Sequence, residues 1–165
     1  MASYHTSIES KNGFAAASRR FMLDEIPEPG ANEMEGSFQR GLPLPSDLEP
    51  GFGAALRHLL RHPGSMVRPR LVSQVAAAFG VQGGPATDLA VAHEYFHTAS
   101  LVFDDLPCMD NATSRRGAPC VHVPFGEPAA ILAALGLINR AYALCWKALA
   151  ACPRADQASK NRKRL

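Results

Sequence analysis

LAVAHEYFHTASLVFDDLPCMD, residues 89–110, is the stretch that decides the fold. Its apolar side chains recur every three or four residues, which is the spacing that places side chains on one face of an α-helix. Pro107 prevents the helix from continuing, because proline lacks the N–H that a helix needs. The sequence therefore predicts a long helix that ends with Asp104 and Asp105, followed by a loop.

The segments around this stretch also have helical patterns that end at proline or glycine. Residues 52–62 place leucines at helical spacing. Residues 128–152 are a long apolar stretch that Pro128 can begin, since proline suits the first position of a helix. A further helix is predicted over 69–79, where four apolar side chains share one face: Leu71, Val72, Val75 and Phe79. No convincing strand is present in the sequence, so the expected fold class is all-α.

The same patterns divide the chain into three regions. Residues 1–50 lack periodicity and are rich in proline and glycine, so we expect a disordered or mobile N-terminal arm. The predicted helices occupy residues 51–152 and form one domain. Residues 153–165 end in KNRKRL and are expected to be a solvated basic tail.

Composition narrows the class of protein and its location. The net charge of +2 gives no reason to expect a nucleic-acid partner. The four cysteines form no CxxC pair, which favours a reducing compartment. No uninterrupted apolar run approaches the roughly 20 residues of a membrane span, so no transmembrane segment is expected. We expect a cytoplasmic protein, and the arginine pair at 19–20 leaves a plastid or another organelle open.

Three carboxylates meet near the end of the central helix. Asp104 and Asp105 lie at a helix C-terminus, where the helix dipole disfavours negative charge by about 0.3–1 kcal/mol each. Asp110 follows the Pro107 turn and can fold back toward them. Such a group repels itself unless a cation lies between its members, and oxygen ligands of this kind suit Mg²⁺. A solvated acidic turn is the alternative interpretation.

Two arginines follow the carboxylates at a short distance in the sequence. Arg115 and Arg116 carry planar guanidinium groups whose donors match phosphate oxygens. Mg²⁺ also keeps coordination positions for phosphate when it binds one or two protein carboxylates. The combination therefore predicts a site for magnesium and a diphosphate.

The stretch HTASLVFDDLPCMDNATSRRGAPCVHVPFGEPAAILAA, residues 97–134, resembles the first aspartate-rich region of the trans-isoprenyl diphosphate synthases, or polyprenyl synthetases. It is most similar to the plant and bacterial geranylgeranyl diphosphate synthases, which have four residues between the aspartate pair and the third aspartate. The agreement extends upstream through RPRLV and covers roughly residues 51–150. The resemblance implies part of an isoprenoid-synthase bundle of long helices around an apolar cavity.

The resemblance also implies a reaction, a cofactor and a product. The family joins an allylic diphosphate to isopentenyl diphosphate in a Mg²⁺-dependent prenyl transfer, with Asp104, Asp105 and Asp110 as the implied catalytic metal ligands. Ala99 and Ser100 stand where bulky aromatic residues would close the cavity floor. Their small size implies a product longer than farnesyl diphosphate, similar to geranylgeranyl diphosphate.

Four further positions are implied as substrate-binding residues. Arg115 corresponds to the residue that holds the allylic diphosphate. Arg116, His97 and Arg68 correspond to those that hold isopentenyl diphosphate.

The sequence departs from the family pattern in ways that bear on activity. PGSMVRP, residues 63–69, stands where the family has GGKRxRP, so Ser65 and Met66 replace basic residues. The family also has a second aspartate-rich motif, in a chain about twice this long, and these 165 residues contain no other DDxxD. We therefore expect a truncated chain that is weak or inactive alone. The alternative is a non-catalytic diphosphate-binding or regulatory subunit. Such a chain could form a homodimer, or a heterodimer with a full-length synthase.

HEYFH, residues 93–97, fits a competing pattern. His93 and His97 lie one turn apart on a helix and could bind zinc, with Glu94 as the base of a metalloprotease. A third ligand is needed, and Asp104 lies about 10 Å further along the helix at roughly 1.5 Å per residue. The metalloprotease is therefore the more remote alternative.

Overall fold

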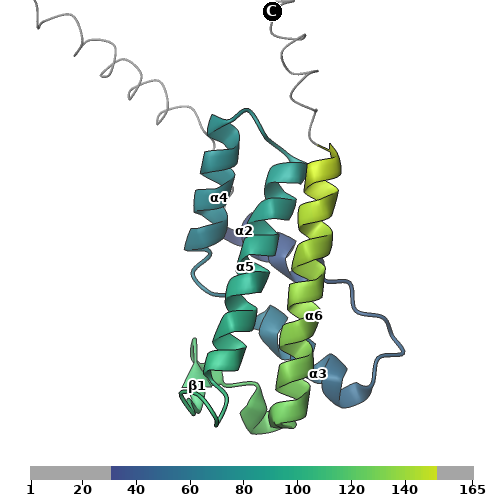
Figure 1. Ribbon diagram of the computed structural model, residues 1–165, viewed down its shortest axis with the longest axis vertical. Coiled ribbons are helices and arrows are strands. Elements are labelled where there is room, and N and C mark those ends of the chain that lie inside the picture. Colours follow the sequence, from purple (N-terminus) through teal and green to yellow (C-terminus); the bar gives the residue numbers. More distant parts are fainter. Residues whose placement is uncertain (1–30, 152–165) are drawn as a thin grey trace, which may run out of the picture.

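The structure is a computed structural model and describes residues 31–151 (Figure 1). It is built from helices, with one two-stranded antiparallel hairpin as its β-structure in the described range. The elements are α2 (Ala31–Arg40), α3 (Pro50–Arg61), α4 (Val67–Ala78), α5 (Gly84–Asp104), β1 (Ser114–Arg115), β2 (Ala118–Pro119) and α6 (His122–Ala151). The all-α prediction is confirmed, and each of the helices predicted from the sequence is present.

Helix α5 is the centre of the bundle. It packs along α6 on one side and against α4 on the other, while α2 and α3 lie behind them (Figure 1). Helices α5 and α6 both carry alanines with no exposed surface, which allow neighbouring backbones to approach closely. These alanines are Ala90, Ala92 and Ala99 on α5, and Ala130, Ala133, Ala134 and Ala141 on α6.

Helix α2 corrects the prediction of a mobile arm over residues 1–50. Met34 and Phe38 lie one turn apart and are 2% and 0% exposed. The Phe38 ring packs edge-on against Tyr95, and the Tyr95 hydroxyl donates a hydrogen bond of 2.5 Å to the Phe38 carbonyl. Two apolar residues at helical spacing thus help to anchor a segment that is otherwise rich in glycine and proline. Residues 1–30 of the expected arm, and the basic tail expected over 153–165, lie outside the described residues.

Helix α6 contains a break near its start. Gly126 has φ 81° and ψ 159°, a conformation that favours glycine. Pro128 then begins the long straight part of the helix, as predicted. By length and composition alone α6 could cross a membrane, although the sequence showed no uninterrupted apolar run of that length. One face of α6, with Leu137 and Leu144 at its centre, is nevertheless buried in the helix bundle.

Two helices leave apolar side chains on the surface of the described chain. The predicted apolar face of α4 is mostly exposed, with Leu71 at 58%, Val75 at 49% and Phe79 at 83%. On α6, Tyr142 and Trp146 are 64% and 76% exposed. The spacing identified the face correctly, but the described residues do not cover it.

Candidate functional site

The site begins where α5 ends. Asp104 is the last residue of the helix and is half-buried, and the buried Asp105 caps it. The Asp110 backbone N–H donates a hydrogen bond of 2.8 Å to the Asp104 carbonyl. The loop that follows Pro107 therefore returns to the helix end, and it places the exposed Asp110 beside Asp104, as the sequence predicted.

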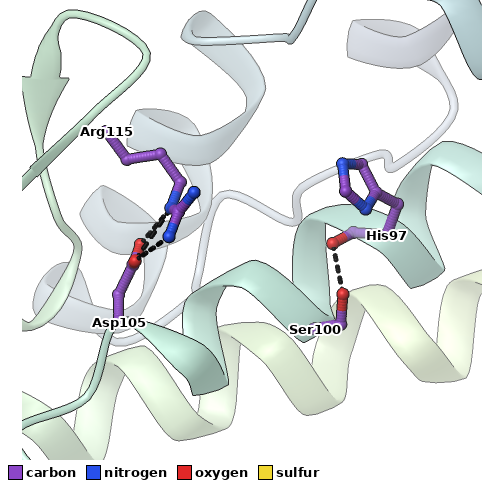
Figure 2. A network of polar contacts seen from close by, with 4 residues as sticks. All are labelled: His97, Ser100, Asp105 and Arg115. Carbon is purple, nitrogen blue, oxygen red and sulfur yellow. Dashed lines mark hydrogen bonds and ion pairs between the residues drawn. The ribbon is translucent and has the colours of Figure 1, made fainter. Parts of the chain in front are cut away.

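Asp105 and Arg115 form a two-point ion pair (Figure 2). The Arg115 Nε donates to both carboxylate oxygens at 2.8 and 2.9 Å, and its Nη2 donates to Oδ1 at 2.6 Å. The hydrogen bonds to Asp105 raise the pKa of Arg115 above its ordinary value. Because Arg115 neutralises it, Asp105 can remain 95% buried at the unfavourable end of a helix dipole.

The hairpin β1–β2 positions both arginines. Its turn is Arg116–Gly117, and both residues have positive φ, 54° and 76°, which is typical of a tight two-residue hairpin turn. His58 of α3 fixes the second strand through a contact of 2.8 Å between its Nε2 and the Pro119 carbonyl oxygen. Arg115 contacts Asp105, whereas Arg116 contacts α5 about three helical turns before Asp105.

Arg116 is held by Glu94 and Thr98. Its Nη2 lies 3.2 Å from Glu94 Oε1, and its Nη1 lies 3.4 Å from the Thr98 hydroxyl. Glu94 is only 2% exposed, and burial raises its pKa while the charges of Arg116 and Arg68 oppose that rise. The guanidinium lies against Gly64, where a Cβ atom would come within 2.8 Å of it.

A cavity of about 400 Å³ opens beside this arginine. Three of the residues that the resemblance implies for isopentenyl diphosphate line it together, namely Arg68, His97 and Arg116, and Arg115 lines it too. Burial and the nearby charges of Arg68 and Arg116 lower the pKa of His97, so its imidazole is neutral near pH 7. With three guanidiniums at its walls, the cavity is suited to a phosphorylated ligand.

The turn before α4 forms another wall of the cavity. Ser65 and Met66, which replace two basic residues of the family pattern, are both part of that wall. Met66 has a left-handed backbone, with φ 55°, and its side chain is 1% exposed. The cavity therefore keeps the arginines from the hairpin and α4 but has no lysine in this turn.

The aspartates can supply only part of the coordination shell of a magnesium ion. Within residues 31–151, no three histidine, cysteine, aspartate or glutamate side chains lie close enough to form a metal cage. Asp104 and Asp110 share the end of α5, and Mg²⁺ commonly takes one or two carboxylates and completes its shell with water and phosphate. This pair of residues fits such an ion. Asp105 is bound to Arg115, and its role as a metal ligand stays a prediction.

The two small residues proposed to set chain length lie in different surroundings. Ala99 is fully buried, whereas Ser100 is exposed, and its hydroxyl donates a hydrogen bond of 2.8 Å to the His97 carbonyl (Figure 2). Neither residue lines the 400 Å³ cavity. Their effect on product length stays a prediction.

The geometry disfavours a zinc metalloprotease. Glu94, the base of the HExxH pattern, is buried in an ion pair with Arg116. His97 lines the cationic cavity, while His93 is exposed.

Sequence reasoning missed the residues that hold Arg116. Glu94, Thr98, Leu101 and Asp105 recur at intervals of four, three and four residues, so they share one face of α5. That spacing would have shown that both arginine partners belong to a single helix face. Gly64 carried no comparable signal, because its role depends on a contact with a residue 52 positions away.

The chain is similar to known proteins in both sequence and structure. The family model described as polyprenyl synthetase matches residues 49–161. The chain is 45% identical over 106 residues to the geranylgeranyl diphosphate synthase of Pseudescherichia vulneris, a match that covers 63% of this chain and 34% of that protein. It is 38% identical over 124 residues to a mitochondrial geranylgeranyl pyrophosphate synthase of Arabidopsis thaliana, covering 75% of this chain and 36% of that one.

The structural comparison gives the same answer. The crystal structure of a geranyltranstransferase from Thermotoga maritima superposes with a TM-score of 0.65 at 38% identity, and the match covers 71% of this chain and 43% of that one. The chain spans about a third of the length of the curated relatives it matches. The described helices are accordingly part of an isoprenoid-synthase bundle, and the chain belongs to the polyprenyl synthetase family.

Proposed function

We propose that this chain provides the first diphosphate-binding region of a prenyltransferase that condenses an allylic diphosphate with isopentenyl diphosphate. The observation that carries the proposal is the cavity lined by Arg68, His97 and Arg116 beside the carboxylates that end α5. The names of the relatives support a prenyl diphosphate product of geranylgeranyl length. Their bacterial and mitochondrial members also support a location in the cytoplasm or in an organelle.

Each group has a distinct task in this proposal. Asp104 and Asp110 would hold Mg²⁺, and the bound ion would supply positive charge to the diphosphate that leaves. Arg115 uses its Nε and Nη2 on Asp105, so its Nη1 is available for the allylic diphosphate. Asp105 would join the metal only if that ion pair opened.

The second substrate binds in the cationic cavity. Arg68 and Arg116 attract the diphosphate of isopentenyl diphosphate, and the neutral His97 offers one N–H donor. The guanidinium of Arg116 is fixed before the ligand arrives, because Glu94 and Thr98 hold it. Fixed donors of this kind need little reorganisation when charge develops on the substrate.

Calorimetric titration of pyrophosphate with and without Mg²⁺ tests the site. We expect tighter binding with Mg²⁺, and the double substitution Asp104→Asn with Asp110→Asn should abolish the gain. Asp47→Asn removes an exposed carboxylate from a distant loop and serves as the control. An unchanged metal-dependent gain in the double variant would show that the metal site lies elsewhere. Stoichiometric zinc that is lost on His93→Ala would support the metalloprotease instead.

Prenyl transfer by these 165 residues alone should be weak or absent. The chain contributes carboxylates to one side of the leaving group, and removal of one electrostatic element from an active site typically costs about 10²–10³ in rate. The measurement is the incorporation of radiolabelled isopentenyl diphosphate into extractable product with geranyl or farnesyl diphosphate and Mg²⁺. Robust turnover by the purified chain would contradict this expectation.

A second candidate function is a diphosphate-binding subunit that pairs with a complete synthase. The exposed apolar side chains of α4 and α6, among them Phe79 and Trp146, favour it because they offer helical surface to another chain. Ser65 in place of a cavity lysine also favours binding over catalysis. Sedimentation of the chain with a geranylgeranyl diphosphate synthase should show a mixed dimer that Trp146→Glu disrupts. Independent sedimentation of the two proteins would exclude this candidate.

A further inference from the structure

A buried acid lies in the wall of the cationic cavity. Glu94 is 2% exposed and lines the same cavity as Arg68 and Arg116. A carboxylate beside an anion site lowers the local positive potential, so on charge alone it should weaken the binding of a phosphorylated ligand. Its presence there needs another physical reason.

The contacts of Arg116 supply that reason. Glu94 Oε1 lies 3.2 Å from Nη2, the Thr98 hydroxyl lies 3.4 Å from Nη1, and Gly64 leaves room for the guanidinium. Glu94 and Thr98 are one helical turn apart on α5, which is the central helix of the bundle. These contacts use two of the five N–H donors of Arg116 and leave three for a ligand.

We propose that Glu94 is a positioning residue that holds the Arg116 guanidinium in its diphosphate-binding orientation. The inference rests on the proposed function of the cavity and adds a residue to it. Arg116 is the first residue of the two-residue hairpin turn and has positive φ, so its long side chain would otherwise sample many rotamers. Glu94 restricts it to one orientation, and the affinity for a diphosphate increases because less conformational freedom is lost on binding.

Charge and position predict opposite effects for two conservative substitutions. Glu94→Asp keeps the negative charge but shortens the side chain, so the contact with Arg116 is lost. Glu94→Gln removes the charge but keeps an oxygen that can accept from Nη2. Positioning predicts that Glu94→Asp is the more damaging variant, whereas a purely electrostatic role predicts that Glu94→Asp is neutral and Glu94→Gln binds more tightly.

The experiment is calorimetric titration of pyrophosphate in EDTA, which isolates the metal-independent cavity from the aspartate site. We expect Glu94→Asp to raise Kd about tenfold. This is the change expected if the fraction of molecules with Arg116 in its binding orientation fell to about one in ten. Glu94→Gln should stay within about threefold of the unsubstituted chain, in keeping with a weakened single hydrogen bond. Asp88→Asn is the matched control, because it neutralises an ion-paired carboxylate of the same helix away from the cavity.

A second comparison separates positioning from general stability. In an Arg116→Ala background, Glu94→Asp should have no further effect on Kd, since there is no guanidinium to position. Thermal unfolding of each variant is recorded alongside, and a merely structural role would lower the unfolding temperature and leave Kd unchanged. An unchanged Kd for Glu94→Asp, or an equal loss in both backgrounds, would overturn the inference. Failure of the unsubstituted chain to bind pyrophosphate would overturn the proposed function itself, and the inference with it.

Discussion

The ion pair between Asp105 and Arg115 should respond unequally to the loss of its two members. The Asp105 side chain is 6% exposed, whereas that of Arg115 is 35% exposed. Arg115→Ala leaves a buried carboxylate without its partner, and the loss of one member of a fully buried pair costs about 3–5 kcal/mol. Water can enter the space left by a partly exposed arginine, so we expect a loss of about 2–3 kcal/mol in the free energy of unfolding.

Asp105→Asn should cost less. The remaining Arg115 can turn toward solvent, and the new amide oxygen still accepts one hydrogen bond, so the expected loss is about 1 kcal/mol. Urea unfolding followed by circular dichroism at pH 7 measures both values. Lys147→Ala is the control, because it breaks a pair in which the lysine is 67% exposed, and such pairs contribute less than about 1 kcal/mol. Equal losses for Asp105→Asn and Arg115→Ala would refute the reasoning from burial.

Three other results are expected. Burial raises the pKa of Glu94 above 4.5, so the carboxyl group of the native protein keeps its proton to higher pH than that of the unfolded chain. The contribution of Glu94 to stability is therefore complete below pH 4.5 and is lost as pH rises through the native pKa. Urea unfolding of Glu94→Gln across this pH range should lack that loss. Burial and the Asp105 carboxylate raise the pKa of Cys120 to about 11, so peptide mapping after iodoacetamide treatment should find the exposed Cys108 modified before Cys120. Gly64→Ala would place a Cβ 2.8 Å from the guanidinium of Arg116, and it should weaken pyrophosphate binding in EDTA several-fold with little change in unfolding temperature, because the flexible arginine moves.

The sequence predicted the helical elements because their patterns are local. The recurrence of apolar residues along α5 and the stop at Pro107 require no knowledge of the rest of the chain. Helix α2 was missed because glycine and proline surround it, and only Met34 and Phe38 reveal its buried face. The hairpin was missed because each strand has two residues, which is too short for an alternating pattern.

The candidate site could be predicted as a set of residues but not as a set of contacts. The spacing of the aspartates and arginines indicated a diphosphate site, and Arg68, His97 and Arg116 do line one cavity. The partner of each arginine depends on how the hairpin folds against α5, which no local pattern encodes. The structure pairs Asp105 with Arg115, a contact that the spacing did not predict, and the role of Asp105 as a metal ligand stays a prediction.

The apolar faces show a different limit. Side-chain spacing on α4 predicted a face that includes Leu71 and Phe79. Both side chains are more than half exposed in the structure. Helical spacing identifies a face that is suited to burial, but it does not say which segment or chain covers that face.

Paramagnetic Mn²⁺ can replace Mg²⁺ and show where the metal lies. Amide signals of the ¹⁵N-labelled chain are recorded with pyrophosphate and substoichiometric Mn²⁺, and each signal is scored for broadening. A metal held by Asp104 and Asp110 predicts that broadening is greatest over residues 104–111 and weak near His93, which lies about 16 Å away along α5 at roughly 1.5 Å per residue. Broadening centred on His93, or broadening that does not depend on pyrophosphate, would contradict a magnesium–diphosphate site at the end of α5.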